Sequence, residues 1–288
     1  MTALSIAGLM LAGMGHALWN LLAKRSEHKL VFMILAVITG VLLMTPFALV
    51  RLGAPIPPLG WVCIVASGLI ELIYYFLLGA AYTQGDMSLV YPIARGSSPV
   101  FVTLIAVGLS GEHLSWLGTL GIALGVLGVY ILPLPDLSGT SLRAPLASLR
   151  RRAAQLALLN GLSIALYSTV DKQGVKLVDP IVYFWLVLCV SLIGLAPWLW
   201  FRLRQETLSE WRARWKTALA VGALITGGYV LILFILRNNP VSYATAVRSV
   251  SIVFGALLGV IVLKERVTAP RVLGSLVIFA GVVCIGLA

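Results

Sequence analysis

Ten runs of apolar residues, each of a length suited to crossing a lipid bilayer, constrain the fold of this chain more than any other feature. The hydrocarbon core of a bilayer is about 30 Å thick, and a helix of about 20 apolar residues spans it. Strands of a membrane barrel alternate apolar and polar residues over segments of about ten residues, which these runs do not. We therefore predict an all-α membrane protein of ten transmembrane helices, at approximately residues 2–23, 30–50, 59–84, 87–109, 114–132, 153–173, 179–201, 215–236, 241–263 and 270–287.

The composition argues against a soluble fold. Hydrophobic residues make up 60% of the chain and charged residues 11%, whereas a soluble domain is about a quarter charged. The net charge of +11 comes from basic residues at the ends of the apolar segments. Such residues face anionic headgroups and the cytoplasm. Membrane lipid is therefore an expected partner, and nucleic acid is not.

No cofactor or metal ion is expected. Cys63, Cys189 and Cys284 each lie within an apolar stretch, at a spacing that fits no metal or redox motif. The sequence contains no glycine-rich loop for nucleotide phosphates. A membrane-embedded enzyme would need a cluster of His, Asp, Glu or Ser near the interface, and a channel would need rings of like charge or a filter loop. Neither pattern is present, so the sequence favours a protein that is not an enzyme.

The basic residues also predict an orientation. Fifteen of them follow odd-numbered segments, including a long basic loop at 202–216, and four lie on the opposite side. The positive-inside rule then places both termini outside the cytoplasm, in a multi-pass inner-membrane protein, with termini inside as the alternative. The first segment lacks the basic start and cleavage site of a signal peptide, so we expect it to be retained as a helix.

The two halves of the chain resemble each other. Residues 95–101 align with 248–254 at an offset of 153, and the same offset pairs Glu112 with Glu265, Gly121 with Gly274 and Gly128 with Gly281. The expected organisation is one five-helix repeat at 1–132, a basic linker at 133–152 and a second repeat at 153–288. Because five is an odd number, the second half enters the membrane in the opposite sense. Inverted repeats of this kind are typical of secondary transporters, whose binding sites lie near the midplane between the halves.

Three charged residues are predicted to lie deep within helices. Arg95 and Arg248 occupy equivalent places about eight residues into the fourth and ninth segments. Because a guanidinium at that depth is costly, we expect both to face a central cavity and bind a substrate carboxylate. Pairing with backbone carbonyls or a carboxylate for purely structural reasons is the alternative. Glu71, the one acid noted at such depth, is a candidate proton carrier or a fixed partner of Arg95.

Polar and aromatic residues complete the candidate site. Polar side chains in an apolar helix are expected to face a cavity, with hydrogen bonds between helices as the alternative. Deep tyrosines are expected to stack on a substrate, with plain packing equally open. These further candidates are His16, Trp19, Asn20, Tyr74, Tyr75, Tyr91, Ser98, Asn160, Ser163, Tyr167, Tyr229 and Tyr243.

The glycines have a simpler interpretation. Gly121 and Gly125 form a GxxxG pattern in the fifth segment, and Gly274 and Gly281 mark the tenth. Small residues let helices approach closely. We therefore expect these two helices to pack the halves together or to form a dimer face, in a protein that is a monomer or a homodimer.

The chain resembles ten-helix, EamA-type members of the drug/metabolite transporter superfamily. The resemblance rests on the repeat, on the blocks at 91–99 and 243–248, and on the ending 263–268 before a glycine-rich last helix. It implies export of amino acids or related metabolites with broad selectivity, and aromatic amino-acid exporters are the most similar group. The implied mechanism is alternating access. Export of other small metabolites or cationic drugs is the alternative.

Overall fold

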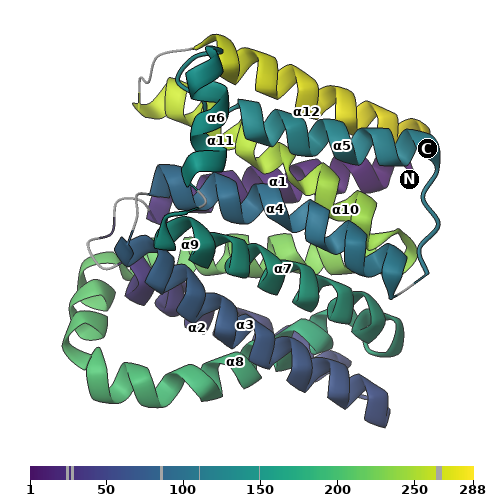
Figure 1. The fold of residues 1–288 in the computed structure, drawn as a ribbon. Helices are drawn as coiled ribbons and strands as arrows, with labels where there is room; N and C mark the ends of the chain where they lie inside the picture. Colours follow the sequence, from purple (N-terminus) through teal and green to yellow (C-terminus); the bar gives the residue numbers. More distant parts are fainter. Residues whose placement is uncertain (24–25, 27–28, 85–86, 110, 149, 264–267) are drawn as a thin grey trace.

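The computed structural model describes residues 1–23, 26, 29–84, 87–109, 111–148, 150–263 and 268–288, and none of them forms a strand. These residues fold into helices that lie against one another in a bundle, with both termini at the same end (Figure 1). The helices are α1 (Ala3–Ala23), α2 (Lys29–Arg51), α3 (Pro58–Gln84), α4 (Met87–Gly108), α5 (Trp116–Ile131), α6 (Gly139–Ser148), α7 (Arg152–Leu177), α8 (Pro180–Arg202), α9 (Arg204–Asn238), α10 (Val241–Arg248), α11 (Val250–Leu263) and α12 (Ala269–Leu287).

The predicted all-α membrane fold is confirmed. Within the described residues, eight segments are long and apolar enough to cross a bilayer, with α10 and α11 together counting as one. The fourth and fifth predicted segments are also helices, but their apolar parts are shorter, at Ile93–Gly108 and Trp116–Ile131. Many large apolar side chains on the long helices are exposed, as expected of surfaces that face lipid tails.

The structure corrects two of the predicted segments and adds a helix to the predicted linker. The ninth segment breaks at Ser249, whose backbone N–H reaches the carbonyls of Ala246 and Val247 and so tightens the last turn of α10. The linker 133–152 contains the short helix α6. The predicted basic loop 202–216 is helical instead and forms the first part of α9, which kinks at Arg214. In this part of α9, the side chains of Glu210 and Arg214 approach to 3.8 Å at i, i+4 spacing. Opposite charges at this spacing stabilise a helix.

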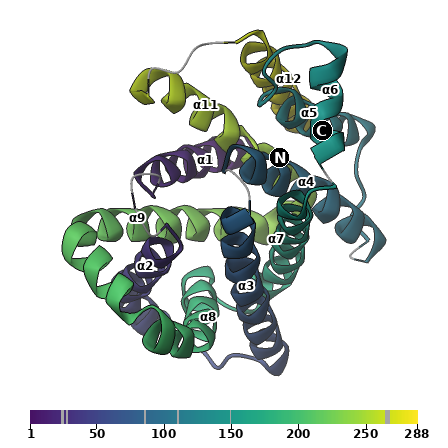
Figure 2. The same ribbon diagram turned by 60° about the vertical axis from the view of Figure 1, so that its left-hand side comes forward.

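The helices pack in pairs that repeat between the two halves. Helix α3 packs on α7, and their counterparts five segments along, α9 and α1, also pack on each other. The contact of α4 with α7 is matched by that of α11 with α1, and the contact of α2 with α9 by that of α8 with α3. Figure 2 shows α9 running between α1 on one side and α2 with α8 on the other. Each half therefore packs against the other rather than forming a separate bundle.

Helices α5 and α12 lie side by side and meet at glycines, as the sequence predicts (Figure 1). Gly121 faces Gly281, and Gly128 faces Gly274. Residue numbers rise along α5 while those of their partners fall along α12, so the two helices run antiparallel. A Cβ atom at Gly121 would lie 2.7 Å from the Gly281 carbonyl oxygen, inside van der Waals contact. The close approach therefore requires glycine, and the glycine face is used inside the chain.

Glu112, in the segment between α4 and α5, caps the start of α10. One carboxylate oxygen accepts from the Val241 backbone N–H at 2.7 Å, and the other accepts from the Ser242 hydroxyl at 2.5 Å. Free N–H groups and the positive end of the helix dipole favour a carboxylate at this place. The contact also ties the first half of the chain to the helix that ends in Arg248.

Replacing Glu112 with alanine is expected to lower the free energy of unfolding by about 1–2 kcal/mol, because the first N–H groups of α10 lose their acceptor. Thermal unfolding of the purified protein in detergent measures this loss. His113→Ala is the matched control, because this neighbouring side chain is exposed. Equal stability losses in the two variants would show that the cap has no special role.

Candidate substrate cavity

A cavity of about 90 Å³ lies between helices of both halves. Since one water needs about 10–15 Å³ measured in this way, the cavity has room for roughly six to nine waters, the scale of a small metabolite. Its walls come from α1, α2, α3 and α4 of the first half and from α7, α8, α9, α10 and α11 of the second. Nine predicted site residues line it: His16, Trp19, Glu71, Tyr74, Tyr75, Arg95, Tyr167, Tyr229 and Arg248.

Aromatic rings form a continuous wall of the cavity. Tyr74 lies edge-on to Tyr75, with ring centroids 5.2 Å apart, and to Tyr167 at 6.1 Å. Tyr167 continues the wall to Tyr229, also at 6.1 Å, and Tyr229 contacts Phe184 at 4.7 Å. These separations are those of favourable aromatic pairs. Phe184 on α8 was not among the predicted residues, because nothing in its apolar segment distinguishes it from a lipid-facing side chain.

Arg248 reaches the cavity from the last turn of α10. The residue is 8% exposed, and its guanidinium carbon lies 5.4 Å from the centroid of the Tyr229 ring. Among the described residues, its guanidinium has no hydrogen-bond or ion-pair partner. A cation over an aromatic face is stabilised by the ring quadrupole, but its N–H donors remain available to a ligand in the cavity.

Arg95 approaches the cavity from α4 and contacts an imidazole. Its Nη2 lies 2.6 Å from Nε2 of His16, and Trp19 donates through Nε1 to Nδ1 of the same ring at 3.1 Å. His16 and Trp19 lie one turn apart on α1. Guanidinium and indole only donate, and a neutral imidazole has one acceptor nitrogen, so two donors converge on one ring. This corner of the cavity is therefore rich in hydrogen-bond donors.

Glu71 is the acid that lines the cavity. It is 7% exposed, and its Oε2 atom has no hydrogen-bond partner among the described residues. Within those residues it forms no ion pair with Arg95, one of the roles considered for it. The cavity thus holds two guanidinium groups and one carboxyl group, with unused acceptor capacity on the carboxyl.

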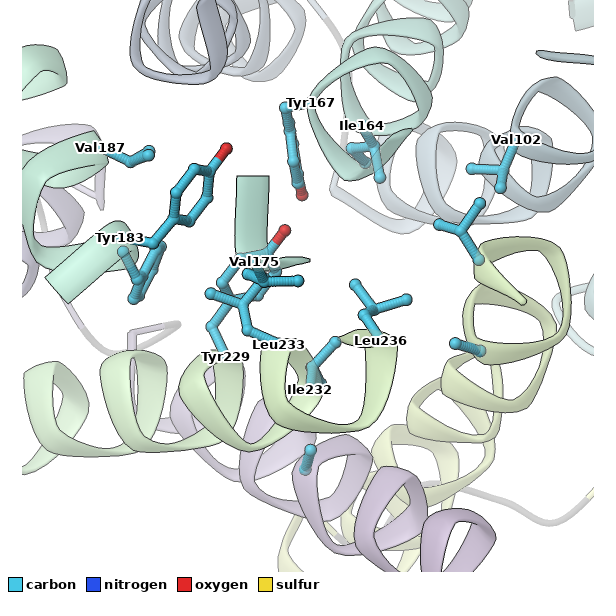
Figure 3. Packing of buried hydrophobic residues seen from close by; sticks show 14 of the residues in the cluster. Val102, Ile164, Tyr167, Val175, Tyr183, Val187, Tyr229, Ile232, Leu233 and Leu236 are labelled. Carbon is cyan, nitrogen blue, oxygen red and sulfur yellow. The ribbon is translucent and has the colours of Figure 1, made fainter. Parts of the chain in front are cut away.

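A second buried acid was missed by the sequence analysis. Asp171 on α7 is 0% exposed and accepts hydrogen bonds from Ser67, Tyr183 and Tyr229. Figure 3 shows Tyr183 and Tyr229 approaching from α8 and α9 among apolar side chains. The predicted sixth segment stopped at residue 173, which placed Asp171 in the boundary region, whereas α7 continues to Leu177. Pro180 was the available signal, since helices usually end before the residue that precedes a proline.

Lys172, the residue after Asp171 on α7, caps the end of another helix. Its Nζ atom donates to the carbonyl oxygens of Leu236 and Asn239, at 2.5 and 2.6 Å. These carbonyls lie at the end of α9, where a cation is favoured by the helix dipole. Two neighbouring charged residues of α7 therefore have different surroundings. Lys172 caps the end of α9, whereas Asp171 is buried in the protein interior.

Five predicted site residues lie outside the cavity lining: Asn20, Ser98, Asn160, Ser163 and Tyr243. Asn20 and Asn160 border a smaller neighbouring cavity, and Asn160 donates to the Tyr74 backbone carbonyl at 2.9 Å. Ser98 and Ser163 bond to carbonyls of their own helices. Such bonds between a hydroxyl and the preceding turn are common in apolar helices.

Tyr243 is turned away from the cavity. Its hydroxyl accepts from the Ser115 backbone N–H at 3.0 Å, and its ring packs on Gly118 at the start of α5. Tyr243 lies in the block of the second half that corresponds to the block containing Tyr91 in the first. The structure does not describe the side chain of Tyr91. The tyrosines predicted for the site therefore divide between a cavity wall and a helix contact.

An all-helical membrane bundle with a partly polar cavity between two packed halves is the architecture expected of a membrane transporter. The sequence model of the EamA-like transporter family matches residues 3–133 and 151–287, and the chain belongs to that family. A match in two segments agrees with a two-repeat architecture. A solved structure described only as "Crystal structure of protein" has a TM-score of 0.73 and 17% identity, covering 99% of this chain and 96% of its own, which shows a shared fold. No curated protein matches the chain.

Proposed function

We propose that this protein transports amino acids with apolar or aromatic side chains, exporting them across the inner membrane with broad selectivity. The observation that carries the proposal is the guanidinium of Arg248, buried in the cavity over Tyr229 with no hydrogen-bond or ion-pair partner among the described residues. A buried cation of this kind is favoured by an anionic ligand, and a carboxylate suits the guanidinium fork. Membership of the EamA-like transporter family supports a transport role for this cavity.

The rest of the cavity supports an amino acid over a simple carboxylate. Glu71 has an oxygen without a hydrogen-bond partner in the described structure, which suits a substrate ammonium. The wall formed by Tyr74, Tyr75, Tyr167, Phe184 and Tyr229 suits an apolar or aromatic side chain. Cationic drugs are the weaker candidate, because two guanidiniums and one carboxyl oppose a net positive ligand.

The proposed mechanism is alternating access by ten transmembrane helices arranged as two inverted repeats, at 1–132 and 153–288. Helices α5 and α12 hold equivalent places in the two halves and run antiparallel at their glycine contacts, as expected of halves inserted in opposite senses. Both termini are proposed to lie outside the cytoplasm, from the basic residues on alternate loops. A reporter fused to Ala288 that is active only in the cytoplasm would be inactive in this orientation.

A flux assay tests the substrate class. The protein is reconstituted into liposomes, and exchange of labelled L-tryptophan is measured against unlabelled competitors, with and without a pH gradient. We expect L-phenylalanine, L-tyrosine and L-leucine to compete, and tryptamine, which lacks the carboxylate, to compete poorly. Strong competition by tryptamine or by a cationic drug would contradict the proposal. Dependence of net flux on the pH gradient would identify proton coupling, and indifference would identify a facilitator.

A further inference from the structure

Asp171 occupies an enclosed site next to the cavity. Ser67 on α3 and Tyr183 on α8 donate to its Oδ1, at 2.5 and 2.8 Å, and Tyr229 on α9 donates to its Oδ2 at 2.6 Å. Both carboxylate oxygens are thus held by hydroxyl groups from three other helices. Among the described residues Asp171 forms no ion pair. Burying a carboxylate without a contacting cation is costly, and a cation further away lowers that cost.

Tyr229 joins Asp171 to the cavity cation. Its hydroxyl is bonded to the Asp171 carboxylate, while the face of its ring lies 5.4 Å from the guanidinium carbon of Arg248. The acid therefore contacts the hydroxyl end of the same aromatic side chain whose face carries the cation. A hydrogen bond to a carboxylate increases the electron density of a phenol ring, and so strengthens its attraction for a cation. Opposite charges also attract strongly across a medium of low dielectric constant.

The Tyr229 ring also keeps the hydrogen-bond donors of Arg248 away from the Asp171 carboxylate. A direct contact with a carboxylate would be bidentate and would occupy the guanidinium donors. A substrate carboxylate would then have to displace that partner. With Tyr229 as a spacer, Asp171 can balance the positive charge without contacting the guanidinium, whose donors remain available to the cavity.

We propose that Asp171 is a positioning residue for substrate recognition, holding Tyr229 beneath Arg248 and balancing its charge, so that the guanidinium is open to a carboxylate. This inference rests on the proposed function, because it assigns the carboxylate contact to Arg248. Asp171 itself does not line the cavity and acts through Tyr229. The competing interpretation is that the three hydroxyl bonds serve only to hold α3, α7, α8 and α9 together.

Binding measurements on the purified full-length protein separate these interpretations. Asp171→Asn removes the charge with little change of shape, and Tyr229→Phe keeps the ring but removes its link to Asp171. We expect each variant to weaken binding of labelled L-tryptophan by at least about tenfold. Both substitutions break the same link. The double variant should therefore have about the same tryptophan affinity as the single variant with the larger loss. Binding of tryptamine, which carries no carboxylate, should change little.

Thr39→Val is the matched control, because Thr39 also bridges the halves from a buried position, donating to the Ala218 carbonyl at 2.9 Å, but lies outside the cavity. It should leave tryptophan affinity within about twofold of the wild type. Equal losses for tryptophan and tryptamine in Asp171→Asn, or independent losses that multiply in the double variant, would overturn the proposal. Unchanged tryptophan binding in both single variants would do the same.

A measurement without substrate keeps the inference separate from the proposed function. Thermal unfolding is followed for Asp171→Asn, Arg248→Gln and the double variant. If Asp171 balances Arg248, removing the cation should recover part of the stability lost with the acid, so the shifts in Tm should not add. Additive shifts would contradict the charge balance. Coupled shifts in a protein that binds no amino acid would instead leave the Asp171 assignment standing and refute the proposed substrate class.

Discussion

Replacing Arg248 with alanine is expected to abolish measurable tryptophan exchange while leaving the amount of folded protein unchanged. The guanidinium is the cavity cation whose donors have no described partner, so the substrate carboxylate would lose its main charged contact. Removing one partner of a buried, hydrogen-bonded charge pair costs about 2–5 kcal/mol, which is at least about thirtyfold in affinity. Equilibrium binding and liposome exchange measure the loss.

Three further variants sharpen this result. Arg248→Lys keeps the charge but lacks the planar fork and stacks less well on Tyr229, so it should recover only part of the affinity. Arg237→Ala is the control, because Arg237 is an exposed arginine in the last turn of α9. Arg95→Ala should also reduce exchange, through loss of the donor cluster around His16. Normal flux through the alanine variants at both 95 and 248 would refute the assignment of these arginines.

Replacing Gly121 with valine is expected to cause a large loss of stability. A Cβ at this position would lie 2.7 Å from the backbone oxygen of Gly281, and a backbone atom cannot turn aside as a side chain can. Overpacking of this kind costs about 1–3 kcal/mol, and separating the two helices would also remove the contact at Gly128. We expect a lower Tm and a lower yield of folded protein in detergent.

Gly125 provides an internal control on the same helix. It belongs to the same GxxxG pattern, but a Cβ placed there meets no atom within 4 Å. Gly125→Val should therefore leave the Tm close to that of the wild type, apart from the small effects of a valine in a helix. A stability loss at Gly125 equal to that at Gly121 would show that glycine is needed for something other than the contact with α12.

The helices and the internal repeat could be predicted because both are properties of the linear sequence. A membrane helix satisfies its own backbone hydrogen bonds, so hydropathy alone indicates where one lies. Arg95 and Arg248 were identified in the same way, since a charge within an apolar run is visible without tertiary structure. Asp171 was not identified, because its distance from the helix end depends on whether the helix stops at 173 or continues to Leu177.

The composition of the cavity could be predicted only in part. These helices are apolar on nearly all sides, so their pattern does not show which way each helix is rotated. Tyr229 and Tyr243 were both predicted to belong to the site, yet one ring lines the cavity and the other packs on Gly118. The sequence by itself determined an all-helical membrane protein of two similar halves with charges placed deep within it. Only the tertiary structure decided which side chains meet, because the link from Asp171 through Tyr229 to Arg248 joins three helices whose relative rotation is set by packing.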